Sequence, residues 1–175
     1  MTMDDYSPAR LAAREAIRDV LFSYCRAVDR GLPDTWHLVF HADAQMHCGP
    51  YQGDISGFSR MLDERRAQVR AAVHMIGNIL FDFADDSHAF VESYCLALEE
   101  FLPAEGETGL NRLARARYAD RFEMRCGQWR IAKRIIVIDH VWAPAPVDTE
   151  AFFKGPAGRR DHDDVVLKER AALGF

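Results

Sequence analysis

The chain has little of what marks several common protein classes. Its 175 residues carry 22 Lys and Arg against 27 Asp and Glu, so it lacks the basic surplus that nonspecific nucleic-acid binding requires. No apolar run approaches the length of a membrane span. The first residues contain neither the basic segment nor the apolar stretch of a secretory signal. We therefore expect a cytoplasmic protein with no nucleic-acid partner and no membrane partner.

Cysteines are few and widely spaced. Cys25, Cys48, Cys95 and Cys126 form no C-x-x-C pair, which disfavours both a disulfide scaffold and a zinc site held by thiolates. We predict four free thiols, packed as small apolar side chains.

Sequence motifs for cofactors are also scarce. There is no G-x-G-x-x-G, no phosphate-loop lysine and no G-x-S-x-G, so nucleotide-dependent and serine-hydrolase chemistry have no support. His37 and His41 stand four residues apart on a predicted short helix, a spacing that can bind a metal, but no further ligand completes a signature. We expect no cofactor and no metal.

What the sequence does have is a helical first part. Ser7 followed by Pro8 is a typical helix start, apolar residues then recur at helical spacing, and Gly31 with Pro33 marks the end. The pattern predicts helices over 8–30, 34–40 and about 54–70, with a strand over 42–48.

The second part is rich in strands. From residue 74 the apolar period changes to two, which predicts strands over 74–83 and 88–101, a loop over 102–111 and a pair of strands about Cys126-Gly127-Gln128. After Trp142 the composition shifts to Pro, Gly and charged residues. We predict one domain over 1–142 and an extended tail over 143–175 that wraps the domain or a neighbouring subunit. Helices followed by antiparallel strands predict an α+β fold in which helices pack on a curved sheet and leave a pocket.

Three residues could carry chemistry in that pocket. Asp29 falls at the edge of the apolar stripe at the end of the first helix, and His74 opens a strand among apolar and small residues. Each residue also has a purely structural interpretation. Asp29 could be a solvated acid at a helix end, or it could pair with Arg26 or Arg30, and His74 could be a buried histidine whose ring is hydrogen-bonded in the core. Together they could form a dyad in which the carboxylate fixes the tautomer of the imidazole and raises its basicity. Tyr24 could then donate a proton or polarise a carbonyl.

Several stretches in a fixed order carry a family resemblance. They are Ile17–Asp29, Asp34–Gly49, His74–Asn78, Val91–Tyr94, Arg117–Phe122, Gly127–Ala132 and the tail segment Gly158–Asp164. This order resembles the SnoaL-like branch of the NTF2-like superfamily, over roughly residues 10–165. The resemblance implies a cone-shaped, strongly bent antiparallel sheet with packed N-terminal helices that enclose a deep apolar pocket.

The resemblance also implies an activity. Members similar to scytalone dehydratase, bile-acid dehydratases and the dehydrochlorinase LinA use an Asp–His pair for eliminations without a cofactor. Asp29 and His74 fall at the positions of that pair, and Tyr24 precedes Asp29 by five residues, as a tyrosine does in the bile-acid dehydratases. We therefore expect a cofactor-independent lyase, most simply a dehydratase, that acts on an aromatic, polyketide or steroid-like ring compound.

Other functions are also compatible with the sequence. The same base could cleave a carbon–carbon bond, as in release of formaldehyde from an aromatic diol, or isomerise a ketone. The small β subunits of ring-hydroxylating dioxygenases share the fold and carry no catalytic centre. A ligand-binding module without catalysis is a third possibility.

Further residues are expected at the site and at its supports. Asp120 is expected to be buried in an ion pair with Arg134 or Arg117. A homodimer or homotrimer is the expected assembly. The expected substrate contacts are His47, Asn78, Tyr94, Tyr118, Arg134 and Trp142.

Overall fold

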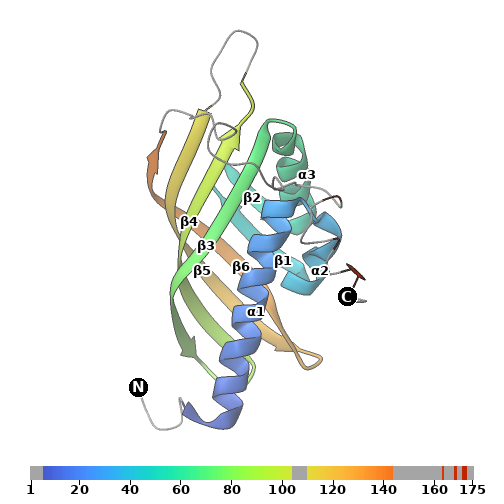
Figure 1. Cartoon of the computed structure of the whole chain (residues 1–175). Coiled ribbons are helices and arrows are strands. Elements are labelled where there is room, and N and C mark those ends of the chain that lie inside the picture. Colours follow the sequence, from blue (N-terminus) through green and yellow to red (C-terminus); the bar gives the residue numbers. More distant parts are fainter. Residues whose placement is uncertain (1–5, 104–109, 144–162, 164–167, 169–170, 173–175) are drawn as a thin grey trace.

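The computed structural model describes residues 6–103, 110–143, 163, 168, 171 and 172. Within residues 6–143 a long helix comes first, a short helical segment and two strands follow, and a third helix precedes four consecutive strands (Figure 1). The helical elements are α1 (Pro8–Arg30), the 3-10 turn η2 (Pro33–Thr35) with α2 (Trp36–Val39), and α3 (Ile55–Arg66). The strands are β1 (Phe40–Cys48), β2 (Tyr51–Asp54), β3 (Val69–Phe83), β4 (His88–Phe101), β5 (Leu110–Arg125) and β6 (Gln128–Trp142). Within the described ranges, no helix is long and apolar enough to cross a membrane.

The strands form one bent sheet in the order β2-β1-β6-β5-β4-β3. The helices lie on one face of this sheet and leave the other face uncovered by helices (Figure 1). The α+β prediction with a curved sheet is confirmed. One detail of it is wrong, because β1 runs parallel to β6 while every other neighbouring pair is antiparallel. Apolar alternation along a strand encodes which face is buried and says nothing of strand direction.

Helix α1 follows its sequence signals closely. The Ser7 side chain accepts a hydrogen bond from the Arg10 backbone N–H at 3.3 Å, and Gly31 ends the helix in the left-handed region at φ 61°. Both features supply partners for backbone groups that a helix end leaves unpaired. The buried stripe includes Ile17, Leu21 and Tyr24, which pack toward the sheet.

Some boundaries differ from the sequence prediction. Strand β2 was not expected, β3 begins at Val69 rather than at residue 74, and α3 ends at Arg66. The histidine pair is also placed differently, because α2 ends at Val39 and His41 lies on β1, buried, with its Nε2 2.9 Å from the Glu123 carbonyl oxygen. The two histidines therefore do not share a helix face.

The cysteines are all free, as predicted. Cys25 and Cys95 are buried and Cys48 is half-buried. The expectation of packing is wrong for Cys126, which is exposed at the β5–β6 turn, because residues at a hairpin tip face solvent. The predicted tail over 143–175 lies almost wholly outside the described residues.

Candidate active site

The end of α1 and the first half of β3 bring Asp29 and His74 together. The Nδ1 atom of His74 lies 2.6 Å from Oδ1 of Asp29, and the backbone N–H of His74 donates to Oδ2 at 3.1 Å. The Asp29 carboxylate therefore accepts hydrogen bonds from both the ring and the main chain of His74, and the two bonds together fix the position and the plane of the imidazole. Only 15% of the Asp29 side chain and 11% of the His74 side chain is exposed.

This hydrogen bond selects a tautomer. With the proton of the neutral ring on Nδ1 and directed at Asp29, Nε2 keeps its lone pair and can accept a proton. The carboxylate also stabilises the imidazolium that would form. An Asp–His pair arranged in this way can act as a general base, provided that a substrate reaches Nε2.

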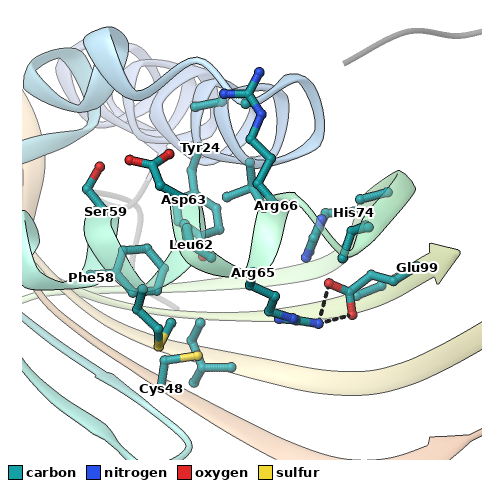
Figure 2. Close-up of a pocket in the computed structure, with 18 of the residues that line it drawn as sticks. Tyr24, Cys48, Phe58, Ser59, Leu62, Asp63, Arg65, Arg66, His74 and Glu99 are labelled. Atoms are coloured by element: carbon teal, nitrogen blue, oxygen red, sulfur yellow. Dashed lines mark hydrogen bonds and ion pairs between the residues drawn. The ribbon is translucent and has the colours of Figure 1, made fainter. Parts of the chain in front are cut away.

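A cavity of about 130 Å³ beside His74 provides that space. It lies between α1, α3 and the concave face of the sheet, and Figure 2 shows His74, Tyr24, Phe58 and Leu62 among the side chains that line it. In other proteins an apolar cavity of about 150 Å³ admits benzene, so this volume suits a single ring. Four small residues on the sheet side of the lining keep the cavity open: Ala72, Ala97, Ala114 and Ala116.

Two tyrosines of the lining rest on one buried arginine. The guanidinium carbon of Arg134 lies 4.1 Å from the ring centre of Tyr24 and 4.3 Å from that of Tyr118. Arg134 is fully buried and donates to both oxygens of Asp120 at 2.7 and 2.6 Å. The predicted ion pair of Asp120 is thus confirmed, with Arg134 as the partner.

The tyrosines remain neutral at ordinary pH. Burial raises the pKa of Tyr24 and that of Tyr118 well above 10, and the nearby Arg134 opposes the shift without cancelling it. Burial by itself lowers the pKa of Arg134, but the opposing effects of Asp120 and the two tyrosines are larger. The net pKa of Arg134 is raised above its ordinary value, so the guanidinium stays charged. A neutral phenol on the cavity wall is a hydrogen-bond donor, which is the state that assistance to a departing oxygen requires.

The expected substrate contacts divide into two groups. Tyr118 lines the cavity, and Arg134 lies behind the two tyrosines, fully buried and outside the lining. The other four are exposed and lie outside the lining: His47, Asn78, Tyr94 and Trp142.

Strand geometry explains these positions. His47 precedes the lining residue Cys48, and Tyr94 precedes the buried Cys95, so each points to the opposite face of its strand. Asn78 has the parity of His74, but a shift of register between Ile76 and Ile79 turns it outward. Trp142 is the last residue of β6 and is 43% exposed.

The structure adds a charged cluster that the sequence analysis missed. Arg65 of α3, Glu99 of β4 and Arg112 of β5 all line the cavity. Strand parity could have found Glu99 and Arg112. Glu99 continues the inward series through Cys95 and Ala97, and Arg112 pairs with Glu99 on the same face of the sheet. Among the described residues, no group of three or more His, Cys, Asp or Glu is placed to hold a metal ion.

Comparison with known proteins places the chain in a family. The model of the SnoaL-like domain matches residues 9–135. The chain belongs to the SnoaL-like domain family. Comparison with curated protein sequences finds no significant match.

Solved structures share the fold of this SnoaL-like protein at low sequence identity. A scytalone dehydratase-like protein from Novosphingobium aromaticivorans is 19% identical over 79% of this chain and 92% of its own, with a TM-score of 0.69. The hexachlorocyclohexane dehydrochlorinase LinA-type3 from Novosphingobium barchaimii is 20% identical over 85% of this chain and 98% of its own, with a TM-score of 0.71. At these identities the likeness shows the fold alone.

Proposed function

We propose that this SnoaL-like protein is a cofactor-independent lyase that removes water from a ring-bearing small molecule. The observation that carries the proposal is the hydrogen-bonded pair of Asp29 and His74 on the wall of a ring-sized cavity. The two structural neighbours named above support it, because their names denote enzymes of elimination reactions.

The proposed reaction starts with proton transfer. His74 Nε2 removes a proton from an acidic C–H of the substrate, and Asp29 stabilises the imidazolium through its bond to Nδ1. The electron pair forms the new double bond as the carbon–oxygen bond breaks. The departing hydroxide, hydrogen-bonded by the neutral Tyr24 phenol, receives the proton that the His74 imidazolium carries and leaves as water, which restores the base. General acid–base groups of this kind contribute typically about 10²–10⁴-fold each.

We also infer that the protein forms a homo-oligomer through the face of the sheet that the helices leave open. Large apolar side chains stand exposed on this outer face of β3, β4 and β6. They are Val73, Met75, Leu80, Phe90, Tyr94, Leu96, Leu98 and Trp142. Contiguous apolar surface of this kind marks a contact with another protein, and Tyr94 and Trp142 belong to it rather than to the cavity.

The proposed activity is tested by mass spectrometry. Purified protein is incubated with a panel of ring-bearing alcohols and diols, with no cofactor added, beside the variant His74→Gln. We expect loss of water from one substrate with wild type and a rate about 10²–10⁴-fold lower with the variant. Loss of formaldehyde or isomerisation would assign the same base to a different bond. Equal turnover by the variant would contradict the proposal.

A further inference from the structure

The charged residues of the cavity lining are not balanced. Oε1 and Oε2 of Glu99 receive hydrogen bonds from Nη2 of Arg65 at 2.6 and 2.7 Å. The Nε and Nη2 atoms of Arg112 donate to the same carboxylate, the Nε atom at 2.8 Å. Two guanidinium groups therefore share one carboxylate, which leaves one positive charge in this cluster. Arg66 and Asp63, the other two charged residues of the lining, carry opposite charges.

Exposure within the cluster is uneven. The Glu99 side chain is 9% exposed, whereas those of Arg65 and Arg112 are 32% and 34% exposed. The carboxylate thus lies beneath the two cations, and the guanidinium groups form the accessible side. Within the part of the chain that the structure describes, Nε and Nη1 of Arg65 and Nη1 of Arg112 make no hydrogen bond. These N–H groups are available to a ligand.

The two arginines are held in place from several sides. Their guanidinium carbons lie 5.5 and 5.2 Å from the ring centre of Phe101, on the same strand as Glu99. Figure 2 shows Arg65 extending from α3 to Glu99, with His74 on the same side of the cavity. A preformed pair of planar donors is the arrangement that recognises carboxylates and similar anions.

Sheet register places this cluster one step from the base. His74 pairs with Ala97 and Ala72 pairs with Glu99 across β3 and β4, so His74 and Glu99 are diagonal neighbours on one face, with Cα atoms about 7–8 Å apart. Arg112 pairs directly with Glu99 across β4 and β5. A molecule the size of one substituted ring can therefore touch both His74 and the arginines, with the alanines beneath it.

We propose that the substrate is a ring-bearing carboxylate and that Arg65 and Arg112 bind its anionic group while His74 faces the reacting carbon. The N–H groups of Arg65 and Arg112 that Glu99 leaves without a partner offer an anionic ligand charge-assisted hydrogen bonds on the wall of a largely apolar cavity. Glu99 orients the two arginines and weakens their field, so it limits affinity for the anion. This inference names the substrate class of the proposed lyase and rests on that function for its catalytic meaning.

Calorimetric titration with two probes tests the anion site without turnover. Benzoate carries the carboxylate, and benzamide is its neutral counterpart of the same shape. We expect wild type to bind benzoate at least about tenfold more tightly than benzamide, since hydrogen bonds to charged groups are the stronger kind. Arg65→Gln and Arg112→Gln should each bring this ratio to about threefold or less. Arg70→Gln is the matched control, because Arg70 forms an exposed ion pair with Glu100 outside the cavity lining, and it should keep the wild-type ratio.

The variant Glu99→Gln separates a binding role from a purely structural one. It keeps both arginines and the shape of the side chain but removes the competing charge, so benzoate affinity should rise about threefold or more while benzamide affinity stays unchanged. A cluster that only ties α3 to the sheet predicts no gain. Equal binding of the two probes by wild type would overturn the anion site and leave the lyase proposal standing. Absence of turnover with benzoate selectivity intact would overturn only the lyase proposal.

Discussion

Asp29 stands where a carboxylate is unfavourable, near the C-terminus of a helix, whose partial negative charge repels it. The structure shows what compensates. The ring and the backbone N–H of His74 both donate to the Asp29 carboxylate. The bond from the backbone ties strand β3 to helix α1, and the bond from the ring holds the imidazole against the carboxylate. A helix-end acid with two fixed donors from one residue is therefore an oriented partner rather than a solvated surface group.

The buried pair of Arg134 and Asp120 gives a first prediction at this scale. Removing one member of a buried ion pair leaves the other charge without compensation, so Arg134→Met should lower the free energy of unfolding by about 3–5 kcal/mol. The double variant Asp120→Leu, Arg134→Met should recover much of that loss, since it leaves no lone charge. Urea denaturation followed by circular dichroism measures both. A single variant within about 1 kcal/mol of wild type would contradict this account.

The two cavity tyrosines predict the response to alkali. Their pKa values in the folded state lie above the value of about 10 expected for the unfolded chain. Neutral Tyr24 and Tyr118 therefore contribute stability that is complete below pH 10 and is lost as the pH rises above it. We expect tyrosinate absorbance at these two residues to appear together with loss of near-ultraviolet circular dichroism.

Phenylalanine variants check this assignment. In Tyr24→Phe, Tyr118→Phe, the loss of stability above pH 10 should be shallower than in wild type. Ionisation of both tyrosines while the near-ultraviolet signal is intact would show that the phenols are more accessible than the structure indicates.

Residue patterns could predict part of the site. The family resemblance pointed to Tyr24, Asp29 and His74, and Tyr118 was an expected substrate contact. The structure places Asp29 against His74 and both tyrosines on the cavity wall. The outward position of Asn78 and the place of Arg65 in the cavity lining were not predictable in the same way. The first depends on a bulge, which shifts parity locally, and the second on the packing of α3 against the sheet.

Among the elements, the β5–β6 hairpin contains an unusual residue. Its two-residue turn consists of Cys126 at φ 52° and Gly127 at φ 75°. Both positions require the left-handed region, where Asn-Gly is favoured and a non-glycine residue such as Cys is uncommon. Cys126→Asn should therefore stabilise the protein by a few tenths to about 1 kcal/mol. Thermal unfolding measures it, and Gly127→Ala is the opposite control, expected to destabilise by about 1–2 kcal/mol.

The elements themselves were largely predictable. Helix α1 and strand β4 have the predicted bounds, because caps, glycines and alternation are local signals. The parallel pairing of β1 with β6 was not, since it depends on which distant segment lies alongside. The short strand β2 pairs locally with the end of β1, but Tyr51 is its one apolar side chain, so no alternation marks it in the sequence. Local pattern fixes which face of a strand is buried, and tertiary packing fixes its neighbour.

For the whole molecule, the open face of the sheet predicts self-association. Register aligns Leu98 with Val73 on one side and with Leu113 and Trp142 on the other, so apolar side chains run across four strands.

We expect light scattering after size exclusion to give a dimer or trimer. Leu96→Asp, in the adjacent row, should shift it to the monomer, and Leu38→Asp on α2 should not. A monomeric wild type at micromolar concentration would contradict the assembly.

The central claim is that His74, oriented by Asp29, acts as a base toward a ring compound in the cavity. The most direct test follows exchange of the acidic C–H protons of cyclohexanone, a ketone of a single ring, by proton NMR in deuterated water. We predict that wild type accelerates this exchange over buffer, that His74→Gln lowers the acceleration about 10²-fold or more, and that His140→Gln, an exposed histidine of β6, leaves it unchanged. Exchange by His74→Gln as fast as by wild type would contradict the claim.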